Sequence, residues 1–267
     1  MTMEKILWKH IQTLKATAPL VHNITNYVVM NTTANALLAA GASPVMAHAK
    51  SEVQDMAALA HSLVINIGTL DEYWSEAMLM AAEAAHTQGK PWILDPVGAG
   101  ATPFRDTVLQ QLLQFRPTVI RGNASEIIAL AKANSTRTKG VDSTAESNEA
   151  VAAAMTIVKH SPSIVCISGA TDIITDGSQT ILIRNGHPLM TKVTGLGCTA
   201  SALIGAFIGI TADKTEATAA AMALIGIAGE LAEQQSKGPG SLQQHLIDKL
   251  YNLTEEEFYS RIKIEKQ

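Results

Sequence analysis

Short apolar segments alternate with longer helical patterns through the first two thirds of the chain, and this alternation restricts the possible folds. Apolar runs of strand length occupy residues 20–22, 43–47, 63–67, 92–94, 118–120 and 163–168. The segments between them have the length and the apolar spacing of amphipathic helices. Such alternation is typical of βαβ units, in which helices connect parallel strands and cover the sheet. We therefore predict a three-layer α/β/α fold with a mainly parallel central sheet.

The remaining segments complete this prediction. Residues 171–175 and 179–184 flank Asp176-Gly177, a strong turn signal, and they predict a hairpin at one edge of the sheet. Residues 135–147 are polar and predict an exposed loop. The last third, 197–250, reads as mainly helical. Because no repeat or low-complexity linker divides the chain, we expect residues 1–267 to form a single domain. The predicted helices are 3–17, 27–40, 52–61, 71–88, 104–115 and 149–160.

Composition narrows the functional classes. The net charge is −4, so no basic field is present to attract nucleic acid. Two cysteines, Cys166 and Cys198, indicate a reducing, cytoplasmic setting rather than a disulfide framework. The apolar stretches 199–210 and 217–228 are shorter than the roughly 20 residues of a membrane span, so we expect buried helices and no membrane contact. Only 16% of residues are charged, which favours an oligomer with charge-poor interfaces.

A glycine turn precedes the first apolar helix of the last third. It comprises Gly195, Leu196, Gly197 and Cys198. The two glycines let the backbone turn sharply and approach a ligand, and the free N–H groups of the following helix can bind a phosphate. The same pattern also fits a tight turn that only starts a buried helix, and the turn alone does not separate the two.

Acidic residues follow two of the predicted strands. Asp95 ends the strand at 92–94 and precedes a glycine-rich loop, where a carboxylate can hold Mg²⁺ near phosphates or can cap the turn. Glu126 follows Asn123 at the spacing of a helix capping box, and it could equally face the metal. Arg121, between these strand ends, is a candidate phosphate ligand. For Asp95 and for Glu126, the metal-binding role and the structural capping role both stay open.

Polar residues also follow the early strands. His22-Asn23-Ile24-Thr25-Asn26 comes after the first strand, and Met46 and Gly68 come after the next two. Asn26 could hydrogen-bond a substrate heteroatom, and Met46 could form an apolar wall. Turn asparagines and a core methionine are the simpler interpretations of these residues.

Together, the segments 22–26, 95–99, 121–126 and 195–198 resemble the hydroxyethylthiazole kinase family of the ribokinase-like superfamily, over nearly the whole chain. The resemblance implies ATP- and Mg²⁺-dependent phosphorylation of the hydroxyethyl group of 4-methyl-5-(2-hydroxyethyl)thiazole in thiamine biosynthesis and salvage. It also implies homotrimers with active sites between subunits. The residues implied are Met46, Asn26, Gly68 and Gly195 for the thiazole, Arg121 and Ser168 for the ATP phosphates, Asp95 and Glu126 for Mg²⁺ beside ATP, and Gly195, Gly197 and Cys198 for catalysis at the anion hole.

Cys198 departs from the wider superfamily, in which an aspartate usually ends the glycine turn as general base. A helix N-terminus lowers a thiol pKa, so we expect Cys198 to be partly thiolate, although bound ATP would oppose that charge. Two alternatives remain at this point: a non-catalytic thiazole-binding protein, and a dehydratase of hydrated nicotinamide nucleotide on the same fold. The missing aspartate is the support for the first, whereas Cys198 and the early asparagines oppose the second.

Overall fold

The computed structural model describes residues 1–133 and 146–267. The predicted loop at 135–147 falls mostly outside these residues, and its last two residues belong to a helix. Strands and helices alternate as predicted from the N-terminus to residue 123. Two helices, Ala124–Ala133 and Glu146–His160, then precede the next strand, and only the second of them was among the predicted helices. The strands are β1 (Leu20–Ile24), β2 (Ser43–Val45), β3 (Ser62–Asn66), β4 (Trp92–Asp95), β5 (Val119–Asn123), β6 (Ile164–Ser168), β7 (Asp172–Thr175), β8 (Thr180–Ile183) and β9 (Ile264–Lys266).

These strands form one sheet in the order β2-β1-β3-β4-β5-β6-β7-β8-β9. The pairs from β2 to β6 are parallel, and β6 through β9 pair antiparallel, which confirms the mainly parallel sheet. The predicted hairpin is β7–β8, but its place at the edge of the sheet was wrong. Strand β9 pairs with β8 and forms that edge. Its sequence, Ile-Glu-Lys, contains no apolar run, so the sequence pattern did not predict it. Charged residues are common on exposed edge strands.

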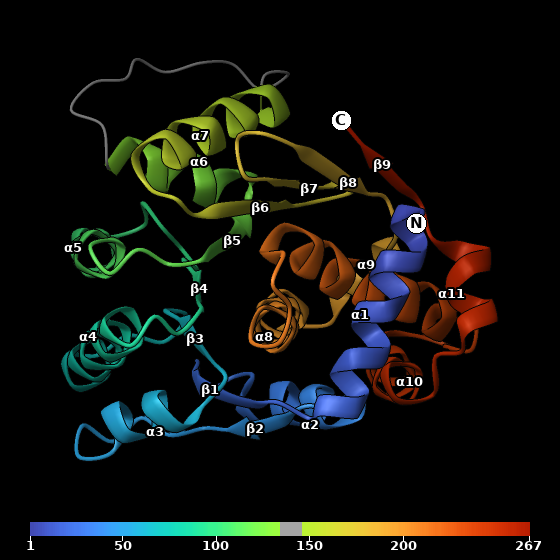
Figure 1. The fold of residues 1–267 in the computed structure, drawn as a ribbon, viewed down its shortest axis with the longest axis horizontal. Helices are drawn as coiled ribbons and strands as arrows, with labels where there is room; N and C mark the ends of the chain where they lie inside the picture. Colours follow the sequence, from blue (N-terminus) through green and yellow to red (C-terminus); the bar gives the residue numbers. More distant parts are fainter. Residues whose placement is uncertain (134–145) are drawn as a thin grey trace.

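Helices cover both faces of the sheet (Figure 1). One layer contains α3 (Val53–Leu59), α4 (Glu72–Thr87), α5 (Pro103–Leu113), α6 (Ala124–Ala133) and α7 (Glu146–His160). The other contains α1 (Met3–Thr17), α2 (Met30–Ala40), α8 (Leu196–Ile208), α9 (Lys214–Glu233), α10 (Pro239–Asn252) and α11 (Glu255–Arg261), with the short 3₁₀ helix η2 (Pro188–Lys192). Each layer buries its own apolar cluster against the sheet. The predicted three-layer α/β/α architecture is therefore confirmed.

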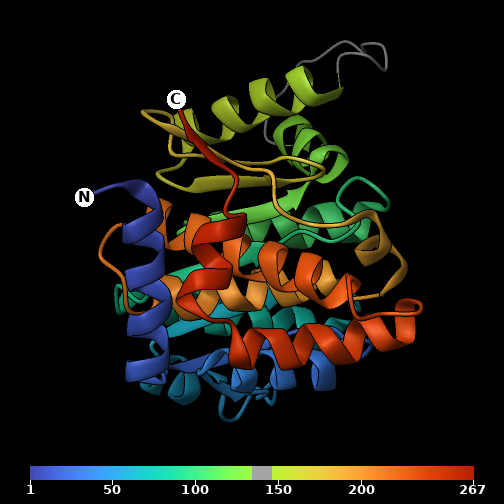
Figure 2. The ribbon, with the colours of Figure 1, turned by 90° about the vertical axis from the view of Figure 1, so that its right-hand side faces the viewer.

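Helices α8 and α9 form the centre of the second layer, and α1 and α10 cover them from outside (Figure 2). Helix α8 packs closely on the sheet, because a Cβ at Gly205 would overlap the side chain of Val64 on β3. Helix α9 is long and apolar enough to cross a membrane, but 89% of its apolar window is buried inside the fold. It is therefore a core helix, as the sequence predicted for 217–228.

The start of α2 is later than predicted and bears on the site. The helix begins at Met30 rather than at residue 27. The side chain of Asn26 explains the delay, since its Oδ1 accepts a hydrogen bond from the Val28 N–H at 3.1 Å. Such a local side-chain bond stabilises a turn in place of the first helical turn. Asn26 is thereby fixed at the carboxyl end of β1.

Candidate functional site

A chain of buried hydrogen bonds joins the carboxyl ends of β1, β3 and β4. Asn66 is at its centre: its Oδ1 accepts from Asn26 Nδ2 at 2.8 Å and from the Gly68 N–H at 2.9 Å. Its Nδ2 donates to Asp95 Oδ2 at 2.6 Å. Ser201 on α8 donates to the same oxygen at 2.8 Å. This network fixes Asn26 and Gly68, two residues expected at the thiazole pocket, relative to Asp95.

Cys198 extends this network into helix α8. Asn26 Nδ2 donates to its Sγ at 3.4 Å. Burial raises the pKa of the Cys198 thiol, and the nearby Asp95 raises it further, while hydrogen bonds from Asn66 and Asn26 and the charge of Arg121 oppose the shift. The expected lowering at the helix N-terminus was therefore wrong. Because desolvation disfavours the charged form, Cys198 is a neutral thiol at neutral pH.

The predicted glycine turn is the start of α8. Gly195 has φ 82°, in the left-handed region, and a Cβ there would overlap the Val29 side chain. At Gly197 a Cβ would lie 2.7 Å from Arg121 Nη1. The first-turn N–H groups of the helix have no intrahelical acceptor and carry its positive end. Gly195 therefore allows the turn to pack against Val29, and Gly197 allows it to pack against Arg121. The free N–H groups at the start of α8 lie beside the Arg121 guanidinium.

Arg121 and Ser168 meet at the ends of β5 and β6. Arg121 Nη2 donates to Ser168 Oγ at 2.7 Å, and the Arg121 Nε is buried and has no hydrogen-bond partner among residues 1–133 and 146–267. Buried donors without partners are rare, and at a functional site they often await a ligand. The structure thus brings the two predicted phosphate ligands together, directly beside Gly197.

Glu126 forms the predicted capping box. Its backbone N–H donates to Asn123 Oδ1 at 2.9 Å, and its Oε2 accepts from the Asn123 N–H at 2.8 Å. Its Oε1 also accepts from the Gly98 N–H at 3.1 Å, which ties the end of β5 to the loop after Asp95. The structural interpretation of Glu126 is therefore confirmed, and its oxygens keep further lone pairs for a second role.

Asp95 is completely buried, and its Oδ1 has no hydrogen-bond partner in the part of the chain that the structure describes. Burial raises the pKa of this carboxyl group, and the neighbouring Glu126 charge also raises it, whereas Arg121, Ser201 and Asn66 lower it. No group of three His, Cys, Asp or Glu side chains within residues 1–133 and 146–267 could hold a metal ion by itself. A Mg²⁺ ion held mainly by nucleotide phosphates needs only one or two carboxylates from the protein. Asp95 and Glu126 have free lone pairs and fit that requirement.

Met46 lies just after β2, next to β1, and is half-buried. Its neighbour Ala47 is fixed by His22 of β1, whose Nε2 donates to the Ala47 carbonyl at 2.8 Å. Burial lowers the pKa of His22, so the ring is neutral and carries its proton on Nε2. The role predicted for Met46, as an apolar wall of the thiazole pocket, stays a prediction.

A cavity of about 550 Å³ opens between the ends of β6 and β8, η2, and helices α8 and α9. Arg121, Ser168 and Gly197 line one part of it. Asp172 lies across from this part, and its Oδ1 accepts from the Gly169 N–H at 3.0 Å. The apolar lining consists of Pro188, Met190, Leu196, Ala200, Met222 and Ile225.

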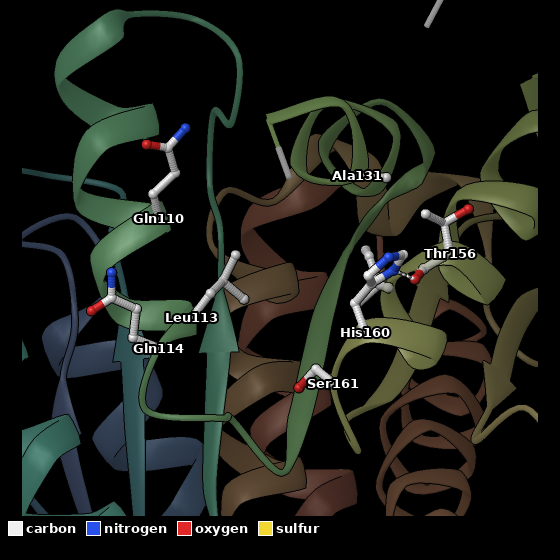
Figure 3. Close-up of a pocket in the computed structure, with 8 residues that line it drawn as sticks. Gln110, Leu113, Gln114, Ala131, Thr156, His160 and Ser161 are labelled. Carbon is white, nitrogen blue, oxygen red and sulfur yellow. Dashed lines mark hydrogen bonds between the residues drawn. The ribbon is translucent and has the colours of Figure 1, made fainter. Parts of the chain in front are cut away.

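A second cavity, of about 440 Å³, lies between α5, α6 and α7 (Figure 3). Gln110 of α5 and Gln114, which follows that helix, face His160 at the end of α7 and the next residue, Ser161. His160 is held by a hydrogen bond from its Nδ1 to the Thr156 carbonyl at 2.7 Å. Gln114 and Ser161 precede β5 and β6 in the chain. This cavity is therefore near the amino ends of the strands, away from the residues described above.

Sequence analysis missed several residues of this site. Asn66 and Ser201 complete the hydrogen bonds of Asp95, and Asp172 lines the larger cavity. Asn66 carried a usable signal, because it is a polar residue within the otherwise apolar run 63–67. Met222 of α9 carried none, since an apolar residue on a buried helix looks the same whether or not it borders a cavity.

Comparisons with known proteins identify the family and the fold of the chain. The model of the hydroxyethylthiazole kinase family matches residues 11–256. A hydroxyethylthiazole kinase of Syntrophus aciditrophicus is 56% identical over 258 residues, 96% of each chain. The solved hydroxyethylthiazole kinase of Pyrococcus horikoshii OT3 is 43% identical, with a TM-score of 0.91 over 98% of this chain and 99% of that one. A ribokinase-like superfamily protein of Enterococcus faecalis, 15% identical over 92% and 93%, shares the fold with a TM-score of 0.65.

Proposed function

The chain belongs to the hydroxyethylthiazole kinase family, and from this premise we propose that it transfers the γ-phosphoryl group of ATP to the hydroxyethyl group of 4-methyl-5-(2-hydroxyethyl)thiazole at the start of α8. The match confirms the family and activity expected from the sequence. Nothing in the comparisons favours a non-catalytic binding protein or a nucleotide-hydrate dehydratase. The roles of individual residues are proposals, and they rest on the contacts described above.

ATP binds in the 550 Å³ cavity in this proposal. Arg121 supports the assignment most directly, because its guanidinium lines the cavity, bonds Ser168 and packs against Gly197. A phosphate chain placed there would reach the first turn of α8 while the base occupies the apolar part. Met190, Met222 and Ile225 would then contact adenine. The sequence could not identify these contacts.

The thiazole alcohol binds on the other side of the same turn. Asn26 and Gly68 are fixed by Asn66, and Asn26 also contacts Cys198. We place the thiazole ring against these residues, with Met46 as the apolar wall and Gly195 at its base. Its hydroxyl group would then lie near Cys198, facing the end of the phosphate chain.

In the reaction, the hydroxyl oxygen forms a bond to the γ-phosphorus as the bond from that phosphorus to the β-γ bridging oxygen breaks, which gives the thiazole phosphate and ADP. In the loose transition states typical of phosphoryl transfer, the hydroxyl proton leaves late, and here it would be released to solvent after the new bond to phosphorus has largely formed. The neutral Cys198 thiol therefore positions the hydroxyl, and Arg121 and the α8 N–H groups stabilise the moving phosphoryl group. Mg²⁺, beside Asp95 and Glu126, would neutralise charge on the phosphates.

The assembly and compartment are also proposed. Tyr27 and Val28 follow β1 at the site and are 59% and 66% exposed, and Tyr73 nearby is 47% exposed. Such an apolar surface beside the thiazole pocket supports a homotrimer in which a neighbouring subunit covers it. Both cysteines are free thiols, which suits the cytoplasm. We propose one catalytic domain over residues 1–267.

Steady-state kinetics test this function. With ATP and Mg²⁺, we expect ADP release with the thiazole alcohol and almost none with a hydroxymethylpyrimidine. Thiazole binding without ADP release would identify a non-catalytic binding protein. Turnover of hydrated nicotinamide nucleotide in place of the thiazole would identify the dehydratase.

A further inference from the structure

Arg105 lies in the first turn of α5 and is not a nucleotide ligand in the site above. Its guanidinium donates to three backbone carbonyl oxygens. Nη1 donates to Ile67 at 2.5 Å and to Val97 at 2.8 Å, and Nη2 donates to Gly68 at 3.0 Å. An arginine at the edge of a phosphate site is usually interpreted as a phosphate ligand. Here, however, both terminal nitrogens of the guanidinium donate to the backbone.

The three carbonyls belong to two loops that carry the site. Ile67 and Gly68 follow β3, and the Gly68 N–H donates to Asn66 Oδ1, which also holds Asn26. Val97 follows β4, one residue before Gly98, whose N–H donates to Glu126. Arg105 therefore joins the loop on the thiazole side to the loop beside the two carboxylates.

Helix α5 is itself anchored to the second loop, so the guanidinium has a fixed base. Thr102 Oγ1 accepts from the Arg105 N–H at 3.3 Å, and Asp106 Oδ1 accepts from the Gly100 N–H at 2.8 Å. A Cβ built at Gly98 would lie 3.6 Å from Arg105 Cδ, so the side chain runs along this loop. A lysine has one compact ammonium and cannot reproduce the planar arrangement of donors.

We propose that Arg105 is a positioning residue for the phosphoryl acceptor: it sets the spacing between the Gly68 loop and the Asp95 loop, and so the position of Asn26 relative to Cys198. This inference rests on the proposed function, because it takes Asn26 and Gly68 to hold the thiazole. It predicts a defect on the thiazole side of the site that leaves ATP binding intact.

The test compares Arg105→Ala and Arg105→Lys with the parent and with Arg184→Ala. Arg184 pairs with Glu265 at the far edge of the sheet, and its side chain is 45% exposed, so it serves as the control. For Arg105→Ala we expect kcat to fall on the order of 100-fold, since small displacements of reacting groups have effects of this size. We expect the thiazole KM to rise about tenfold, the energy of one or two charge-assisted hydrogen bonds. The ATP KM should stay at the parent value, Arg105→Lys should be intermediate, and methylguanidinium should restore part of the activity of Arg105→Ala.

Unchanged thiazole kinetics in a folded Arg105→Ala protein would overturn the inference, as would equal rises in both KM values. Hydrogen exchange supplies a readout that does not depend on activity: the Gly68 and Gly98 amides should exchange faster in the variants, with the β3 amide of Val64 unchanged. Unchanged exchange at Gly68 and Gly98 also overturns it. If Arg105→Ala does not fold, the exchange result for Arg105→Lys decides. A parent enzyme without thiazole kinase activity would refute the proposed function, whereas the exchange result would still judge Arg105.

Discussion

The two sides of the start of α8 are built differently. On the thiazole side, Asn26 and Asn66 are 5% exposed or less and are hydrogen-bonded to each other, and Asn66 continues the network to Asp95 at the proposed metal position. On the nucleotide side, Arg121 has a buried donor without a partner and faces a cavity of about 550 Å³. One side has most of its polar groups paired within the protein, and the other leaves donors for a ligand.

This difference follows from what each side must do. The acceptor hydroxyl has to be held at a fixed distance and angle, and a buried network with few alternatives gives that precision. The nucleotide carries its own charges and enters and leaves in each cycle, so its site must offer unpaired donors and open space. The predictions below damage one side at a time, and each asks whether the kinetic defect stays on that side.

Replacement of Arg121 by methionine should have the largest effect. The variant loses the guanidinium that we place on the phosphates, and kcat/KM for ATP should fall by about 10³, near the lower end for arginines that stabilise a moving phosphoryl group. Arg184→Met, at the exposed sheet edge, should leave ATP kinetics unchanged. A defect confined to the thiazole KM would place Arg121 on the wrong side of the turn.

The variant Asn66→Leu should damage the thiazole side next most severely. It removes the acceptor for Asn26 and Gly68 and one donor to Asp95 in a position that is 1% exposed. We expect kcat to fall about 100-fold, because Asn26 loses its position. The free energy of unfolding should fall on the order of 3 kcal/mol, since buried polar groups lose their partners. Kinetics and urea denaturation measure the two effects, with Asn252→Leu on the exposed end of α10 as control.

Two glycines allow a matched comparison of the sides. A Cβ at Gly68 would lie 2.7 Å from Asn26 Nδ2, and a Cβ at Gly197 would lie 2.7 Å from Arg121 Nη1. Overpacking of this kind costs about 1–3 kcal/mol, so each alanine should raise one KM about tenfold. Gly68→Ala should raise the KM for the thiazole and Gly197→Ala that for ATP, whereas Gly240→Ala, with open space around it, should change neither. Equal changes in both constants would contradict the division into two sides.

Sequence reasoning recovered the polar residues at the strand ends better than the apolar lining of the nucleotide cavity. Each strand-end motif is a short polar segment after an apolar run, so Asn26, Asp95 and Arg121 could be recognised and assigned to one sheet edge. Asn66 was missed although it interrupts the apolar run 63–67, because it lies inside the predicted strand rather than after its end. The nucleotide cavity depends on how α9 and η2 pack beside β6–β8, and Met190 and Met222 signal only burial. Strand β9 was missed for a similar reason, since its pairing with β8 is decided by tertiary position rather than by its own pattern.

Cys198 lies between the two sides, and its replacement should have a modest effect. Because the thiol is neutral in this site, little base catalysis is lost, and Cys198→Ser and Cys198→Ala should lower kcat by less than the 10²–10⁴ range typical of a general base. Cys198→Asp should retain or raise kcat, since the superfamily places aspartate there. Single-turnover rates measure the chemical step directly. A loss above about 100-fold in folded Cys198→Asp would contradict a positioning role and would favour a specific need for the thiol.

Asp172→Asn should affect turnover least, because an asparagine keeps the acceptor for the Gly169 N–H; its effect should appear in stability instead. Burial raises the pKa of Asp172 to about 6, against the opposing effects of the Gly169 N–H and Arg121. A carboxyl group with a raised pKa in the folded state favours folding while it is protonated, and that contribution is lost as pH rises from the unfolded value toward the folded one. Between pH 4 and pH 7 the free energy of unfolding of the parent should therefore fall by up to roughly 3 kcal/mol relative to Asp172→Asn.

Urea denaturation of both proteins across this pH range measures the difference. The other carboxyl groups are the same in both proteins, so their contributions cancel. A difference in unfolding free energy that does not change with pH would show that this buried group titrates normally, and the nucleotide cavity would then hold a fixed charge throughout.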